Sequence, residues 1–312
     1  MLSRSYQQQT AKAEKWQLLP YFRARIPRMQ FVDMTNDIAF RKIFGNENKK
    51  IILISFLNAV LKLEGNSHIV EVEILNPYQL PIIKNLKASI IDVRARDKQG
   101  NTYIVEMQVS EPDGLDKRLL YYVSKDYSQQ IESGQQYPRL RPVIFIGIFD
   151  FLFTKETKYL SHHTVCDVED GERVIKDMDF YFIELPKFDK PLSELETITD
   201  KWIYFIKEAE NLNVIPENVD DEGLKAAYNE ANRHSWTKED LDAYDYSEMR
   251  EQDERGKVQL AEQRGEQKGE EKKEIETVLK FHDKGMVDEE IVDLLDIPVE
   301  RVRQIIDTHK NK

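Results

Sequence analysis

Two acidic residues, Asp92 and Glu106, stand in short runs of strand-forming residues on either side of a turn. The runs are IIDVRAR and TYIVEMQVS, and the turn is Asp97-Lys98-Gln99-Gly100. Every second side chain of a strand lies on the same face, so Glu106 and Gln108 project together, and a hairpin brings Asp92 opposite or nearly opposite Glu106. Two carboxylates at one point can bind Mg²⁺, which activates water and neutralises charge on a phosphate. The alternative is that Asp92 and Glu106 lie on a solvent-exposed strand face and bind no ligand.

The composition restricts the class of protein. The 312 residues are 40% apolar, which is enough for a hydrophobic core. The single cysteine, Cys166, is typical of a reducing compartment, so a cytoplasmic location is expected. The longest apolar run, VIFIGIF, is far shorter than the roughly 18 residues of a membrane helix, and no membrane contact is predicted. The sequence has no glycine-rich phosphate loop with its lysine, which argues against a nucleotide cofactor.

Charge is divided unevenly along the chain. Residues 1–155 carry 22 Lys and Arg against 16 Asp and Glu, whereas residues 156–312 carry 23 against 41. The front half is therefore positive within a chain whose net charge is −12. Residues 1–30 form a basic arm in which Glu14 is the single acidic residue. A polyanion could approach from this side. The alternative is that both halves are ordinary solvated surfaces.

Hydrophobic periodicity predicts a mixed α/β domain over residues 31–247. Three strands are expected to form an antiparallel start, followed by a helix over residues 115–133 that Gly134 stops. His162, His163 and Cys166 invite a metal interpretation, but without a partner cluster they are expected to lie in a loop. The predicted elements, in chain order, are IAFRKIF, KKIILISFLNAVLKL, HIVEVEILN, SIIDVRAR, TYIVEMQVS, the 115–133 helix, RPVIFIGIFDFL, DMDFYFIELPKF and helices from 191 to 247.

The C-terminal part differs in composition from the domain before it. Residues 248–273 are rich in Glu, Gln, Lys and Arg, which predicts a charged linker or an exposed helix. Residues 274–312 contain three short helical runs with the outline of a helix-turn-helix. The segment from Met286 to Asp307 contains seven acidic residues but only two basic ones, Arg301 and Arg303. Such a surface is poorly suited to a phosphate backbone. Helical packing or self-association into a homo-oligomer is therefore favoured over DNA reading.

Several motifs occur in a specific order between about Phe31 and Ser247. They are NDIAFRKIFG, FLNAVL, the two strands with Asp92 and Glu106-Met107-Gln108, KRLLYYVSKDYSQQIESGQQYPRLRPVIFIGIFDF, and IELPKF. Together they resemble the recombination-promoting nuclease and transposase family of the PD-(D/E)XK nuclease superfamily. The resemblance implies an α/β restriction-endonuclease-like core, a mixed sheet flanked by helices. The charged stretch and helical tail look like that family's C-terminal extension.

The resemblance assigns roles to individual residues. It implies that Asp92 and Glu106 are the metal ligands, with Mg²⁺ or Mn²⁺ as the cofactor. Gln108 stands where many superfamily members have a lysine, so it can hydrogen-bond the attacking water but supplies no charge. Asp37 matches the acidic residue that usually completes such sites from the first helix. Its alternative role is to favour the dipole at the start of that helix.

Three basic residues are candidates for nucleic-acid contact. Arg41 and Lys42 lie one turn after Asp37 and could meet a phosphate, or they are the wet side of an amphipathic helix. Arg118 matches the family's pattern in the helix after the site and could contact the DNA backbone. The leading hypothesis is a metal-dependent DNA endonuclease that promotes recombination or mobile-element movement. The rival is a catalytically degenerate nuclease fold that binds DNA or protein partners, which the glutamine at position 108 favours.

Overall fold

A computed structural model of the chain describes residues 29–79 and 89–310. The chain divides into two compact units, residues 1–247 and 248–312. The basic arm predicted for residues 1–30 lies outside the described residues except for its last two positions. Within the described ranges, no helix combines the length and the apolar character that a membrane crossing requires.

A six-stranded mixed sheet forms the centre of the first unit. Its strands are β1 Val72–Ile74, β4 Val93–Asp97, β5 Thr102–Gln108, β6 Val143–Phe149, β7 Leu160–Thr164 and β8 Met178–Glu184. They follow the order β1-β4-β5-β6-β8-β7. The first three strands pair antiparallel, as the sequence predicted, and β5, β6 and β8 run parallel to one another. A separate pair is formed by β2 Tyr78–Gln79 and β3 Ser89–Ile90.

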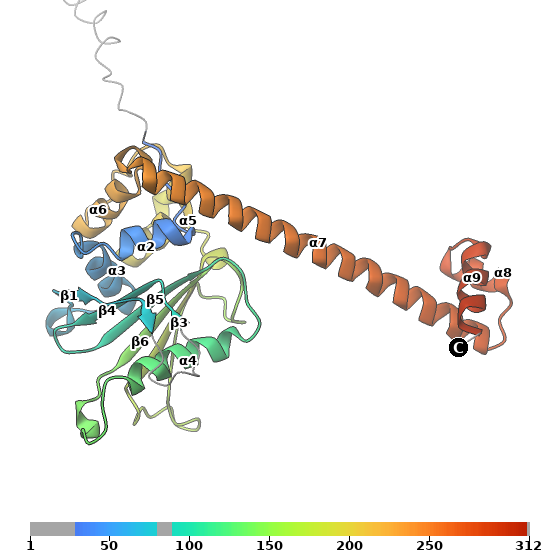
Figure 1. The fold of residues 1–312 in the computed structure, drawn as a ribbon, viewed down its shortest axis with the longest axis horizontal. Coiled ribbons are helices and arrows are strands. Elements are labelled where there is room, and N and C mark those ends of the chain that lie inside the picture. The colour runs from blue at the N-terminus through green and yellow to red at the C-terminus, as the bar shows by residue number, and fades with distance from the viewer. Residues whose placement is uncertain (1–28, 80–88, 311–312) are drawn as a thin grey trace, which may run out of the picture. The chain divides into compact units, whose positions relative to one another are not determined.

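Helices cover both faces of the sheet, as Figure 1 shows. Those of the first unit are α2 Asp37–Phe44, α3 Ile51–Leu61, α4 Leu115–Ser128, α5 Ile198–Glu208 and α6 Glu222–Ala231. On one face, Leu119 and Val123 of α4 join Ile104 and Phe145 in a buried cluster. The other four helices lie on the opposite face around a larger core that includes Trp202. The predicted mixed sheet flanked by helices is therefore confirmed.

The charged C-terminal stretch is helical. Helix α7 extends from Lys238 to Asp283 and includes residues 248–273, which the sequence left open between a linker and an exposed helix. The first of the three predicted terminal helices is the end of α7, and the other two are α8 Asp288–Leu295 and α9 Val299–Lys310. A small apolar cluster of the second unit joins them: Val278, Ile291, Val302, Ile305 and Ile306.

The turn of the β4–β5 hairpin sets the register of the two strands. The Asp97 carboxylate accepts hydrogen bonds from the backbone N–H of Asn101 at 2.9 Å and from its side chain at 2.8 Å. Gly100 takes a φ of +90°, which other residues rarely adopt. With this turn in place, Val93 lies opposite Val105. The next residues along the two strands, at positions 92 and 106, are therefore neighbours.

The helix predicted for residues 115–133 ends earlier, at Ser128. The reason is a contact across the following loop. The Gln130 side chain donates to the Arg141 carbonyl at 3.0 Å and accepts from the Arg141 N–H at 2.8 Å. This pairing takes the chain away from the helix before Gly134, which lies in a turn with a φ of +88°.

The loop predicted around His162 and His163 is wrong, because both residues belong to β7. The His162 ring stacks on Tyr181 of β8 with a centroid distance of 4.2 Å. Its Nε2 lies 2.6 Å from Asp179 Oδ1. These partners are on another strand, and the short polar run carries no local strand pattern, so the sequence did not reveal it. Cys166 follows the strand and is exposed.

Candidate active site

Asp92 and Glu106 lie side by side at one end of the β4–β5 hairpin. The run predicted as one strand bends at Asp92, just before β4, while Glu106 belongs to β5. The backbone N–H of Asp92 donates to Glu106 Oε1 at 3.2 Å, and the backbone N–H of Met107 donates to Asp92 Oδ2 at 2.9 Å. Each carboxylate is held by a backbone group from the other's segment. One oxygen of each is left for side chains.

Three side chains contact these two remaining oxygens. Arg41 of α2 donates to Asp92 Oδ1 from both Nε and Nη2, at 2.9 and 2.8 Å. Gln108 Nε2 donates to Glu106 Oε2 at 3.2 Å and to a backbone carbonyl at 2.9 Å. Arg118 of α4 places Nη2 3.9 Å from the same Glu106 oxygen. The structure thus brings together five of the predicted site residues, from three parts of the chain.

Burial makes the two carboxylates costly to ionise. Asp92 is 8% exposed and Glu106 is 2% exposed. Burial raises the pKa of Asp92, although the Met107 N–H and Arg41 oppose this rise. Burial, followed by the charge of Asp92, raises the pKa of Glu106 well above its ordinary value. A cation between two adjacent buried carboxylates would relieve both effects.

Asp37 lies at the edge of this group. Asn36, not Asp37, caps α2 with its side chain. The Ser247 hydroxyl donates to Asp37 Oδ1 at 2.7 Å, and Arg41 Nη2 lies 3.7 Å from Asp37 Oδ2. After burial and the groups already named, the charge of Asp37 also contributes to the raised pKa of Asp92. Asp37 is therefore close enough to act on the pair electrostatically.

The partners of the Lys42 side chain lie outside the carboxylate pair. Its Nζ lies 2.8 Å from Asp240 Oδ2 and 5.3 Å from the centre of the Trp236 ring. Both partners belong to the chain segment around the start of α7. The neighbouring residue Arg41 contacts the carboxylate pair, so these two cations of one helical turn have different partners.

Tyr122 orients Arg118. Its hydroxyl accepts a hydrogen bond from Arg118 Nε at 2.8 Å, and the guanidinium carbon lies 5.3 Å from the ring centre. The rest of the Tyr122 ring packs in the core under α4. The sequence analysis did not predict this supporting role. The available signal was the spacing of Arg118 and Tyr122, which places them on the same face of a helix.

The chemistry of the donors fits a hard divalent cation held by two carboxylates. Asp92 Oδ1 and Glu106 Oε2 are the oxygens that the backbone does not occupy. Mg²⁺ is commonly held by one or two carboxylates and keeps several waters. In residues 29–79 and 89–310, no group of three or more His, Cys, Asp and Glu residues is arranged to hold a metal.

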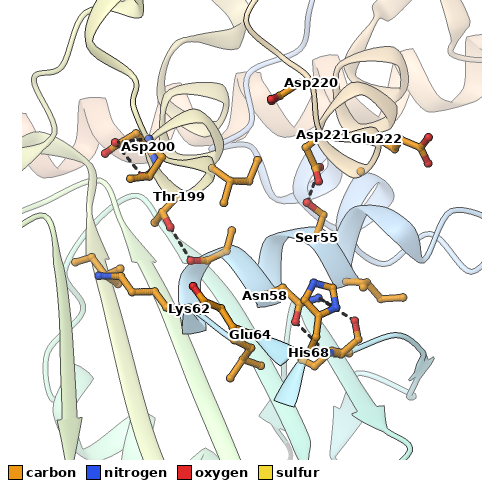
Figure 2. Close-up of a pocket in the computed structure, with 18 of the residues that line it drawn as sticks. Ser55, Asn58, Lys62, Glu64, His68, Thr199, Asp200, Asp220, Asp221 and Glu222 are labelled. Atoms are coloured by element: carbon orange, nitrogen blue, oxygen red, sulfur yellow. Dashed lines mark hydrogen bonds between the residues drawn. The ribbon is translucent and has the colours of Figure 1, made fainter. Parts of the chain in front are cut away.

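A large pocket of the first unit involves neither carboxylate. Its volume is about 1300 Å³, and its lining includes residues of α3, α5 and α6. Figure 2 shows several of these residues, among them Ser55, Thr199 and Asp221. Two of its polar side chains are already paired within the protein. Ser55 donates to Asp221 at 2.6 Å, and Thr199 donates to the Ala59 carbonyl at 2.6 Å. Cavity size alone does not identify the reactive site, whereas closely spaced buried carboxylates with raised pKa values do mark a candidate.

The six-stranded mixed sheet with helices on both faces is consistent with a PD-(D/E)XK nuclease fold. A family described as PD-(D/E)XK nuclease family transposase matches residues 34–261, and the chain belongs to this family. The resemblance inferred from the motifs is confirmed. The curated proteins and the solved structures contain no match to the chain.

Glu184 is another buried carboxylate at the same end of the sheet, but its pKa is shifted in the opposite direction to that of Glu106. The strand register aligns Gln108 with Phe149 and Phe149 with Glu184. Glu184 accepts hydrogen bonds from Lys187 Nζ at 2.6 Å and from the Thr154 hydroxyl at 2.6 Å. Burial alone would raise the pKa of Glu184, but these hydrogen bonds outweigh it and lower the pKa. Glu184 is a satisfied structural carboxylate.

We predict that Glu106→Gln raises the free energy of unfolding of the metal-free protein at neutral pH, whereas Glu184→Gln lowers it. The raised folded pKa of Glu106 means that wild-type stability is lost as pH rises from the ordinary glutamate pKa towards the folded value. The lowered pKa of Glu184 has the opposite sign, so its contribution is present above the ordinary pKa and is lost as pH falls. Each effect is expected on the order of 1 kcal/mol.

Urea unfolding in EDTA, repeated between about pH 5 and pH 8, measures both variants against the wild type. The Glu106→Gln profile should be flatter than that of the wild type as pH rises above the ordinary glutamate pKa. If both substitutions destabilise the protein to a similar extent, the hydrogen bonds of Glu106 offset the burial of its charge as well as those of Glu184 do. That result would contradict the prediction.

Proposed function

We propose that this protein is a Mg²⁺- or Mn²⁺-dependent DNA endonuclease that hydrolyses phosphodiester bonds. The proposal rests mainly on the buried pair of Asp92 and Glu106, held together by backbone hydrogen bonds in a chain of a nuclease family. The family supports DNA as the substrate. The residues themselves would serve the hydrolysis of any phosphodiester.

Asp92 and Glu106 would hold the cation through Asp92 Oδ1 and Glu106 Oε2. A divalent ion supplies Lewis acidity, which activates water and offsets the charge of a phosphate. The backbone N–H groups on the other two oxygens keep the carboxylates from rotating away, so little reorganisation is needed. Asp37 would assist as a third acidic group next to Arg41.

Gln108 would position the attacking water. Its side-chain amide already contacts Glu106 Oε2, so it lies beside the proposed ligand. An amide donates and accepts hydrogen bonds but carries no charge, in contrast to the lysine of many superfamily members. Arg118 is the nearest cation to Glu106 Oε2 among the contacts described above, and it can offset part of the missing charge.

The proposed DNA contacts are Arg41, Lys42 and Arg118. The Arg41 and Arg118 side chains are 41% and 36% exposed, so each has atoms beside the carboxylates and atoms open to solvent. A phosphate near the pair could accept hydrogen bonds from both guanidinium groups. Lys42 would first have to leave Asp240, which makes it the weakest of the three.

The biological role proposed from the family is the promotion of DNA recombination or mobile-element movement. The cytoplasmic location remains a prediction from the single cysteine. Self-association through the C-terminal helical region remains a prediction. A second candidate function is a degenerate nuclease fold that binds DNA or partners without cleavage. The uncharged Gln108 is the observation that favours it.

We predict that the full-length protein nicks or linearises supercoiled plasmid with Mg²⁺ or Mn²⁺, and that Asp92→Asn and Glu106→Gln each abolish this cleavage. The reason is that each variant removes one of the two anionic ligands. Gel electrophoresis of the plasmid measures the products, with EDTA as the metal control. Glu73→Gln is the matched control, because Glu73 is an exposed acidic residue of β1 in the same sheet.

Undiminished cleavage by Asp92→Asn or Glu106→Gln would contradict the assignment of the site. If the folded wild type cleaves no DNA with either metal, the binding-only function becomes the better explanation.

We further predict that Gln108→Lys increases the single-turnover cleavage rate on the order of tenfold, while Gln108→Ala decreases it by a similar factor. Lysine adds a positive charge where negative charge develops, and alanine removes the hydrogen bond to water. Quench-flow or manual time courses with excess enzyme measure these rates. Equal rates for the lysine and alanine variants would exclude a role for this side chain in the reaction.

A further inference from the structure

We infer that Arg41 is a counter-ion in the metal-free protein and that it must release Asp92 before a divalent cation can bind to that carboxylate. This inference rests on the proposed metal-dependent function and adds competition between a protein side chain and the metal. The cluster that carries it consists of Arg41, Asp92, Met107 and Asp37.

The two oxygens of Asp92 have different kinds of partners. Oδ2 accepts from the Met107 N–H, which belongs to β5 and is fixed by the sheet. Oδ1 accepts two hydrogen bonds from one guanidinium, from Nε and Nη2 of Arg41. A carboxylate oxygen has two lone pairs, so the two donors of Arg41 occupy both lone pairs of Asp92 Oδ1. Oδ2 accepts a single hydrogen bond and keeps a second acceptor site, whereas a cation that binds through Oδ1 has to displace Arg41, the partner that can move.

Arg41 has both room and an alternative acceptor. Its side chain is 41% exposed, whereas that of Asp92 is 6% exposed. Asp37 lies one turn earlier on the same helix, with Oδ2 already 3.7 Å from Arg41 Nη2. The Ser247 hydroxyl donates to the other oxygen of Asp37 at 2.7 Å and so holds that carboxylate in place. A displaced guanidinium therefore keeps an anionic partner.

Electrostatics requires this displacement. A guanidinium and a divalent cation repel each other strongly at contact distance in a partly buried site. The same guanidinium reduces the cost of burying Asp92 while no metal is present. The protein therefore binds metal with an affinity reduced by the work of releasing Arg41. Once released, the guanidinium stays beside the site, where a DNA phosphate can accept its hydrogen bonds.

Mn²⁺ titration by isothermal calorimetry, with full-length protein and no DNA, tests the competition. Arg41→Met should bind Mn²⁺ about tenfold more tightly than the wild type, because no charge-assisted hydrogen bonds have to be broken. Arg41→Lys should lie between them, since it keeps the charge but lacks the two-fold contact. Lys49→Met is the matched control. It removes a cation of the first unit whose partner is Glu230 at 2.6 Å, so its affinity should stay close to that of the wild type.

Arg41→Gln provides a second uncharged variant if the methionine variant folds poorly, and circular dichroism checks both. Wild-type Mn²⁺ binding with equal or weaker binding by the folded uncharged variants would overturn the inference alone and leave the proposed function intact. Tighter binding by Lys49→Met to the same extent would also overturn it, because the effect would then be one of net charge. Absence of Mn²⁺ binding in every protein would overturn the proposed function together with this inference.

Discussion

Two hydrogen bonds from backbone N–H groups to carboxylates hold Asp92 and Glu106 against each other, and the rest of the site depends on them. The Asp92 N–H holds Glu106, and the Met107 N–H holds Asp92. Both bonds require the register of the β4–β5 hairpin, which the Asp97 turn sets. The donors are part of the chain backbone, so each carboxylate can turn away only by breaking its hydrogen bond to the hairpin.

Helices on both faces of the sheet supply side chains that reach this pair. Arg41 reaches the pair from α2 on one face of the sheet, and Arg118 reaches it from α4 on the other. The two side chains converge at the end of the hairpin, each on one of the oxygens that the backbone leaves free. Tyr122 supports Arg118 from the core, while Asp37 stands next to Arg41. The sheet thus holds the two carboxylates, and the helices bring the two arginine side chains to them.

The hairpin and its carboxylates could be predicted because the information is local. The alternation of side chains along TYIVEMQVS and the glycine at the turn both lie within a few residues of Glu106. The contact of Arg41 with Asp92 joins residues 51 positions apart, and that of Ser247 with Asp37 joins residues 210 apart. The spacing of apolar and polar residues along the sequence does not predict contacts between such distant positions. β7 was missed for the same reason, since its strand character comes from pairing with β8.

The central claim is that Asp92 and Glu106 bind one divalent cation through the oxygens that the backbone does not occupy. An anomalous difference map from crystals of the Mn²⁺-loaded protein, collected near the manganese absorption edge, tests it most directly. The account predicts a peak bonded to Asp92 Oδ1 and Glu106 Oε2, with the Arg41 guanidinium withdrawn from Asp92. A peak elsewhere, or an unchanged Arg41–Asp92 contact in fully loaded crystals, would contradict it.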